Sequence, residues 1–226
     1  GNIRGEVLSR ANLHTMFYES GRLGRAAREV ERVSLLGERA QDREVRIRAR
    51  VVESQFFINT GSNLGRAHRA LRQAEAELDG EAAYWLNQHV WHALGNVLQL
   101  TGQYDDAIKY FRRLHREASD QQDLSTVARA QLSVTNALLE RRSYEPYVND
   151  APLYGDANEA LVAARRARDL DLELEALRLL GEVLMSEQPE RARTYVDTCI
   201  EQAGKSRRSL ALSKCLWIRG RLLADS

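Results

Sequence analysis

The sequence has few of the residues that make disulfide frameworks, tight turns and β-sheets. Its 226 residues include only two Cys and three Pro, and β-branched residues are sparse and scattered. Two cysteines are too few for a disulfide scaffold. We therefore expect Cys199 and Cys215 to be buried apolar side chains in a reducing compartment. The residues that dominate instead (Ala, Leu, Glu, Gln and Arg) all favour helices.

The chain also lacks a long hydrophobic run and an excess of charge of one sign. No stretch approaches the length of a membrane span, and no signal-peptide pattern opens the chain. The 33 basic and 32 acidic residues nearly cancel, leaving a net charge of +1. A balance of this kind gives no reason to expect nucleic acid or an anionic membrane as a partner. We expect a cytoplasmic protein.

Motifs that would indicate catalysis are missing as well. The sequence contains no Gly-rich phosphate loop, no H-E-x-x-H, no nucleophile elbow and no paired Cys motif. His89 and His92 lie three residues apart and are spaced to reach one metal ion, but no Cys or acidic third ligand lies nearby in sequence. We interpret them as solvent-facing or groove-facing histidines, and we predict no enzymatic activity, no metal and no cofactor.

One stretch, Trp91–Phe111, predicts two amphipathic helices joined by a tight turn. Trp91, Leu94 and Gly95 share a face of the first helix, and Ala107 and Phe111 share a face of the second. Small residues at Gly95 and Ala107 allow the helices to cross closely, while the larger side chains fill the space around the crossing.

The same pattern recurs along the chain at a period of about 40 residues, which is typical of stacked helix pairs. Positions equivalent to Gly95 are His14, Ser54, Thr135, Gly181 and Gly220. A coiled coil would need an uninterrupted heptad, and a four-helix bundle would need no such repeat. The predicted helices are 3–20, 23–41, 43–60, 64–78, 81–100, 104–119, 124–141, 151–168, 172–187, 190–203 and 209–223, with turns at Gly21, Gly61 and Gly102.

The spacing slips at Ser143–Asp150, which replaces a three-residue turn. A longer loop is either a functional segment or a tolerated insertion, and the sequence does not favour one over the other. Tyr144 aligns with Tyr104 and is expected to pack, whereas Tyr147 is expected to be exposed. Asp150 is a candidate N-cap for the next helix, with Pro152 in its first turn.

The W-x2-L-G…Y…A-x3-F pattern resembles the tetratricopeptide-repeat family, and the resemblance extends over essentially the whole chain. The longer repeats resemble those of bacterial signalling proteins and of MalT-like regulators. The resemblance implies an all-α fold: an α-solenoid, wound as a right-handed superhelix, of about five helix pairs plus a terminal helix. We interpret residues 1–226, which begin without Met, as a single domain that is a fragment of a larger protein.

The family resemblance also implies which positions face the concave groove, namely −6, −3 and +1 relative to each crossing residue. Position −6 is Leu8, Arg48, His89, Arg129, Glu175 and Lys214; position −3 is Ala11, Val51, His92, Leu132, Arg178 and Trp217; position +1 is Thr15, Gln55, Asn96, Asn136, Glu182 and Arg221.

The middle of this set is polar and basic, which suits an extended peptide held by its backbone and its acidic groups. The predicted partner-binding residues are Arg48, Gln55, His89, His92, Asn96, Arg129, Asn136 and Arg178. Asn96 and Asn136 match the family's peptide-holding Asn. The Lys of the family's carboxylate clamp is replaced by His92 and Leu132, which argues against that mode of binding.

The predicted function is a non-enzymatic module that binds a peptide or protein segment, or another domain of the same chain. The alternative is the ligand-sensing or peptide-sensing region of a larger bacterial signalling or transcription regulator. Self-association through exposed apolar helix faces at the ends is a third reading.

Overall fold

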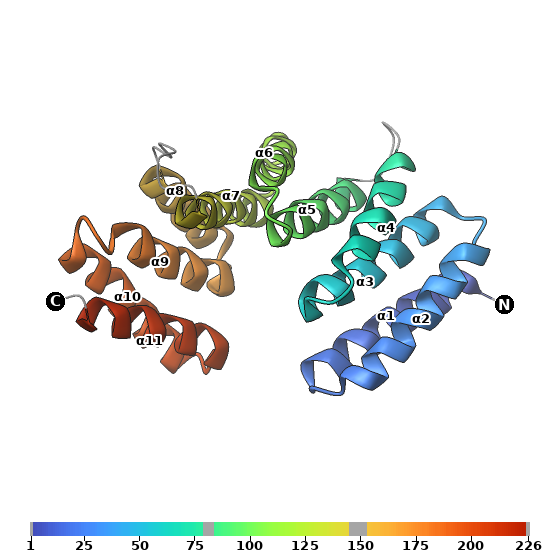
Figure 1. The fold of residues 1–226 in the computed structure, drawn as a ribbon, viewed down its shortest axis with the longest axis horizontal. Helices are drawn as coiled ribbons and strands as arrows, with labels where there is room; N and C mark the ends of the chain where they lie inside the picture. Colours follow the sequence, from blue (N-terminus) through green and yellow to red (C-terminus); the bar gives the residue numbers. More distant parts are fainter. Residues whose placement is uncertain (1, 79–83, 145–152, 225–226) are drawn as a thin grey trace. The chain divides into compact units, whose positions relative to one another are not determined.

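The computed structural model describes residues 2–78, 84–144 and 153–224, and all the regular structure in these ranges is helical (Figure 1). The chain forms two compact units, residues 1–110 and 111–226. The helices are α1 (Ile3–Glu19), α2 (Leu23–Arg39), α3 (Arg43–Thr60), α4 (Leu64–Ala76), α5 (Tyr84–Leu100), α6 (Tyr104–Asp120), α7 (Leu124–Tyr144), α8 (Leu153–Ala167), α9 (Leu170–Leu184), α10 (Pro189–Lys205) and α11 (Ser209–Ala224). Their ends lie within about three residues of those predicted.

Consecutive helices from α1 to α5 in unit 1, and from α7 to α11 in unit 2, pack against each other, and the first helices of successive pairs also contact one another. In unit 1 the first helices are α1, α3 and α5; in unit 2 they are α7, α9 and α11. This is the packing of an α-solenoid, so the predicted all-α fold is confirmed. The handedness of the superhelix and the single domain over 1–226 stay predictions.

Local sequence signals set where the helices begin and turn. The side chains of Asp42 and Asp169 accept hydrogen bonds from backbone N–H groups at the starts of α3 and α9. The three predicted turn glycines, Gly21, Gly61 and Gly102, all adopt positive φ (72°, 62° and 76°). L-residues with a side chain rarely adopt this backbone conformation, which is why glycine occupies these turns.

The predicted crossing positions on the first helices are buried in five of the six cases. His14, Ser54, Thr135, Gly95 and Gly181 are covered. The hydroxyl of Ser54 donates to the backbone carbonyls of Arg50 and Ala67, and Ala67 belongs to the facing helix α4. A small residue here lets the helix backbones approach closely.

The second helices of the pairs share a pattern of two buried residues. Each has a fully buried Ala followed, four residues later, by a buried larger apolar residue. These pairs are Ala26 and Val30, Ala67 and Leu71, Ala107 and Phe111, Ala157 and Leu161, and Ala192 and Val196. The spacing of four residues places both side chains on one helix face.

The sixth crossing position, Gly220, is exposed, which agrees with a terminal helix that has no second helix of its own among the described residues. Two expectations need correction. Tyr144 is 76% exposed instead of packed, because α7 continues through Ser143 and Tyr144 rather than ending in a turn. Cys199 and Cys215 are fully buried as expected, but they form a disulfide and are not free thiols.

Other expectations fall outside the described residues. These are the remainder of the insert, including Tyr147 and Asp150, and Pro152. The helices among the described residues are not long and apolar enough for any of them to cross a membrane.

Candidate functional site

The eight predicted partner-binding residues divide between the two units. Arg48 and Gln55 lie on α3, and His89, His92 and Asn96 lie on α5, all in unit 1. Arg129 and Asn136 lie on α7, and Arg178 lies on α9, in unit 2.

In unit 1, Arg48 and His89 meet at the same aromatic side chain. The guanidinium of Arg48 stacks over the Trp85 ring at 4.1 Å from its centroid, and the His89 ring packs edge-on against Trp85 at 5.9 Å. Arg48 also pairs with Glu44 at 3.5 Å. The residues at position −6 of α3 and α5 therefore contact the same side chain, the ring of Trp85. The sequence did not predict this contact with Trp85.

The other unit 1 candidates are separate from this cluster. The amide of Gln55 donates to the side chain of Asn59 at 2.7 Å. His92 and Asn96 are half-buried on α5, and the Asn96 side chain forms no hydrogen bond with any described residue. An amide of this kind has donors and an acceptor available for a ligand.

In unit 2, Asn136 and Arg178 lie close together, while Arg129 does not join them. Two hollows, of about 400 and 460 Å³, are both lined by Asn136 and Arg178. Arg129 is exposed on α7 and lines neither hollow. We call the residues that surround the hollows at the predicted inward positions the charged surface: Asn136, Glu175, Arg178, Glu182, Lys214, Trp217 and Arg221.

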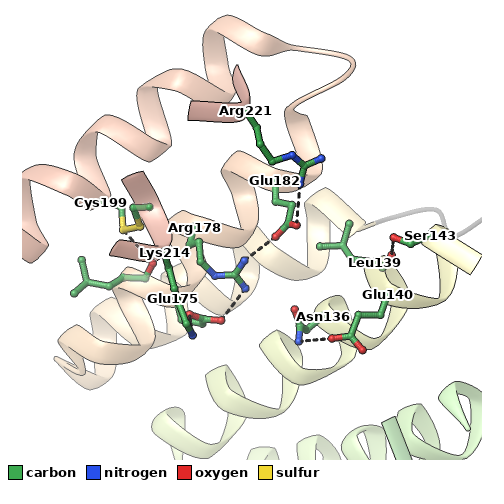
Figure 2. A network of polar contacts seen from close by, with 12 residues as sticks. Asn136, Leu139, Glu140, Ser143, Glu175, Arg178, Glu182, Cys199, Lys214 and Arg221 are labelled. Carbon is green, nitrogen blue, oxygen red and sulfur yellow. Dashed lines mark hydrogen bonds and ion pairs between the residues drawn. A yellow bond between two sulfur atoms is a disulfide. The ribbon is translucent and has the colours of Figure 1, made fainter. Parts of the chain in front are cut away.

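A row of alternating charges runs across the charged surface (Figure 2). Arg178 donates to Glu175 at 2.8 Å and to Glu182 at 2.6 Å, both on its own helix. Lys214 and Arg221, on α11, approach these two carboxylates at the longer distances of 3.6 and 3.8 Å. The central Arg is therefore held tightly, and the two outer cations are held loosely.

Burial and ion pairing have opposite effects on the pKa values of Glu175 and Arg178. Burial alone would raise the pKa of Glu175, but the hydrogen bond and charge of Arg178, with a further contribution from Lys214, bring that pKa below its usual value. Burial would likewise lower the pKa of Arg178, but Glu175 and Glu182 raise it. Both groups are therefore charged at neutral pH.

Arg178 is fixed in place and not free to bind a ligand carboxylate on its own. Its side chain is only 12% exposed, and two carboxylates already accept its terminal N–H groups. Its Nε is buried without a hydrogen-bond partner among the described residues. The more accessible groups lie beside it: Trp217 is 60% exposed, and the Arg221 guanidinium stacks against its ring at 4.9 Å.

Apart from Arg178, the sequence-based set missed the α9 and α11 part of this surface. The five missing residues already stood at the inward positions that the family resemblance implies: Glu175, Glu182, Lys214, Trp217 and Arg221. They were left out because the predicted set favoured polar and basic residues near the middle of the chain. Keeping every inward position of α9 and α11 in the set would have found them.

Among the described residues, no three His, Cys, Asp or Glu side chains gather in a group able to hold a metal ion. Asn136 has one intramolecular partner, since its Nδ2 donates to Glu140 at 3.4 Å. What the charged surface offers is therefore an amide, an exposed indole and two loosely paired cations, which are groups suited to recognition.

Comparison with known families identifies one repeat of the chain, outside the charged surface. The model of the tetratricopeptide repeat matches residues 88–120, which span most of α5 and all of α6. No curated protein matches the chain. Repeats of this family generally mediate protein–protein interaction and are typically not catalytic. Residues 88–120 are thus a tetratricopeptide repeat within an all-α chain of stacked helix pairs, and the predicted family resemblance is confirmed there.

Proposed function

We propose that this chain is a non-enzymatic interaction module that binds a peptide or protein segment on the charged surface of unit 2. One observation carries the proposal. Residues at the same three repeat positions of α7, α9 and α11 converge around two adjoining hollows that share Asn136 and Arg178.

The chemistry of the surface suits an extended segment. The amide of Asn136 can both donate to and accept from a peptide backbone. The exposed ring of Trp217 offers an apolar platform, and aromatic residues of this kind are common anchors at interfaces. Lys214 and Arg221 lie more than 3.5 Å from their carboxylate partners, so they can turn toward acidic groups of the ligand.

The unit 1 candidates form a second contact region in this proposal. Arg48, His89 and Asn96 supply a stacked cation, an exposed imidazole and an amide on α3 and α5. Asn96 occupies the same repeat position as Asn136. Replacing each amide separately therefore reports which unit contacts the partner.

The test begins with peptides selected from a random displayed library against the chain. The dissociation constant of a selected synthetic peptide is then measured by calorimetry. We expect Asn136→Ala and Trp217→Ala each to weaken binding about tenfold, the usual scale for an interface anchor. Both side chains are outside the core, so the melting temperatures should change little.

The matched control is Asn96→Ala in α5. Weaker binding by this variant would indicate that the peptide also contacts unit 1. Unchanged binding would indicate that the peptide contacts unit 2 alone. Unchanged affinity in both Asn136→Ala and Trp217→Ala would show that the charged surface is not the binding site.

The hollows also favour a second candidate function, the sensing region of a larger bacterial regulator. Their volumes of about 400 and 460 Å³ are in the range of small-ligand pockets. A small molecule that raises the melting temperature of the chain, but not that of Trp217→Ala, would favour this role. If selected peptides bind and a metabolite panel produces no shift, the peptide-binding role is favoured.

A further inference from the structure

The disulfide between Cys199 and Cys215 ties α11 to α10 at the part of α11 that serves the charged surface (Figure 2). Cys215 directly follows Lys214 in the sequence and comes two residues before Trp217. The Cys215 side chain is fully buried in the core, whereas Lys214 and Trp217 are exposed on other sides of the same helical turn. A movement of Cys215 therefore also moves these two groups.

The remaining buried face of α11 is small. Apart from Cys215, its buried residues are Ile218 and Leu222, whereas α9 buries seven residues in a helix of similar length. Ala211 and Leu212 pack partly against the same core as Cys215. Burial of apolar side chains among the described residues thus holds α11 less firmly than it holds α9.

The ion pairs of α11 lie near the surface and add little. Lys214 and Arg221 approach the carboxylates of α9, and Arg219 approaches Asp197 of α10 at 3.1 Å. All the side chains in these pairs are at least 26% exposed, and ion pairs between exposed side chains contribute little to stability. A covalent link that limits how far α11 can separate from α10 is therefore a main determinant of its docking.

Reduction of this link is a two-electron exchange with a dithiol. A thiolate of the reagent attacks one sulfur, the bond between Cys199 and Cys215 breaks, and the released cysteine takes up a proton. The second thiolate of the reagent then displaces the other cysteine, and the reagent becomes a cyclic disulfide. The two cysteines together gain two electrons and two protons. Because both are 0% exposed, the reagent reaches them only when the contact between α10 and α11 opens.

We propose that this disulfide is a redox switch that controls the docking of α11 and, with it, the charged surface. This switch rests on the proposed function, because the binding that it controls is the peptide binding proposed above. Docked α11 supplies three members of the charged surface: Lys214, Trp217 and Arg221. Detached α11 leaves Asn136 and Arg178 without them, so the oxidised chain binds the peptide tightly and the reduced chain binds it weakly.

Coupling through α11 has to act in both directions. If oxidation strengthens peptide binding by some factor, the bound peptide must favour the disulfide over the two thiols by the same factor. A disulfide that only stabilised the core, without controlling the docking of α11, would show neither effect.

The first test follows α11 directly and needs no ligand. Hydrogen exchange of the 226-residue chain is measured by mass spectrometry before and after treatment with dithiothreitol, and thiol titration confirms the reduction. We expect exchange in α11 to become about tenfold faster or more on reduction, because the detached state is more populated. Exchange in α7 should change little. This helix is the control, since it lies in the same unit and contains no cysteine.

The second test measures the dissociation constant of the selected peptide for the oxidised and the reduced chain. Reduction should weaken binding about tenfold or more, which corresponds to docked α11 in about one reduced molecule in ten. The double variant Cys199→Ala with Cys215→Ala should bind weakly in both conditions, which controls for effects of the reagent on the peptide. In a buffer of reduced and oxidised dithiothreitol, saturating peptide should raise the ratio of oxidised to reduced chain by the same factor.

The two tests distinguish failure of the switch from failure of the proposed function. Unchanged exchange of α11 after reduction would overturn the switch. Equal affinity of both redox forms for a peptide that Trp217→Ala weakens would also overturn it, while leaving the proposed function intact. A disulfide that dithiothreitol reduces only where all of unit 2 unfolds would overturn it as well. If no peptide binds the charged surface of the oxidised chain, the proposed function fails, and the exchange of α11 decides whether the disulfide controls that helix.

Discussion

At the scale of single residues, the closeness of each helix crossing depends on the size of one side chain. Gly181 and Gly220 occupy the same repeat position but have opposite surroundings. Val196 fills the space beside Gly181, whereas none of the described residues fills the space beside Gly220. Equivalent positions in a repeat therefore need not tolerate the same substitution.

Gly181→Ala is expected to lower the free energy of unfolding by about 1–3 kcal/mol, the usual cost of overpacking. The added Cβ would lie 2.4 Å from Cγ2 of Val196, so the Val196 side chain or one of the two helices must shift. Gly220→Ala is the matched control, and it should be neutral or slightly stabilising because Ala favours helix. Chemical denaturation measures both, and a Gly181→Ala variant as stable as the parent would contradict the close crossing.

The free energy of unfolding is expected to depend on pH through the protonation of one buried residue, His14. Its side chain is buried against Tyr18 and Phe56, its Nε2 has no hydrogen-bond partner among the described residues, and burial lowers its pKa. The unfolded chain therefore binds a proton more readily than the folded chain. Stability should fall as the pH drops through about 6.5, the value for an unperturbed histidine.

The variant His14→Leu should lose this component of the pH dependence between about pH 7.5 and 5.5. One proton accounts for at most about 1.4 kcal/mol per pH unit. Urea unfolding across this range measures the effect, with His68→Leu as the control for loss of a histidine. Identical pH profiles for His14→Leu and the parent chain would argue against the burial of a neutral His14.

At the scale of elements, the helices form for local reasons and are joined by contacts distant in sequence. The disulfide is the clearest case, because it links α10 to α11 across 16 residues. The ion pairs of Lys214 and Arg221 with Glu175 and Glu182 join α11 to α9 on another side. Covalent and ionic links thus hold α11 against both of its neighbours, α10 and α9.

Reducing the disulfide should destabilise unit 2 by up to about 3 kcal/mol, the chain-entropy value for a loop of this length. Unfolding is followed with and without dithiothreitol. A double variant, Cys199→Ala with Cys215→Ala, should be less stable than the oxidised parent and insensitive to the reductant. If the parent were equally stable in both conditions, the bond would not contribute to the folded state.

At the scale of the whole molecule, the chain consists of two compact units whose boundary falls within α6. In repeat proteins each helix pair interacts mainly with its neighbours, so stability is close to a sum of local terms. The predicted single domain over 1–226 would require the two units to unfold together. Close glycine contacts in each unit allow this to be tested.

Gly37→Ala and Gly181→Ala place a similar clash in different units, since each new Cβ would lie 2.4 Å from a neighbouring side-chain atom. We expect each variant to accelerate hydrogen exchange mainly in its own unit, as local coupling predicts. Exchange is measured by mass spectrometry of peptides from α1–α4 and from α7–α10. Equal acceleration in both units would instead support a single cooperative domain.

The helices, the glycine turns and the spacing of the crossing residues could be predicted from the order of the amino acids. These features depend on interactions within one helix or one turn, which periodicity and residue type reveal directly. Ser54 and Gly181 could be assigned to crossings because the period of about 40 residues carried the register from Trp91–Phe111.

The side chains that meet across different helix pairs could be identified only from the folded arrangement of the helices. This arrangement brought Asn136 and Arg178 together with residues of α11, left Arg129 apart, and placed the two cysteines in a bond. Such contacts depend on the angle and offset between helices far apart in sequence, which no local pattern encodes. For the same reason, Gly181 is covered by Val196 whereas the equivalent residue of α11, Gly220, is exposed.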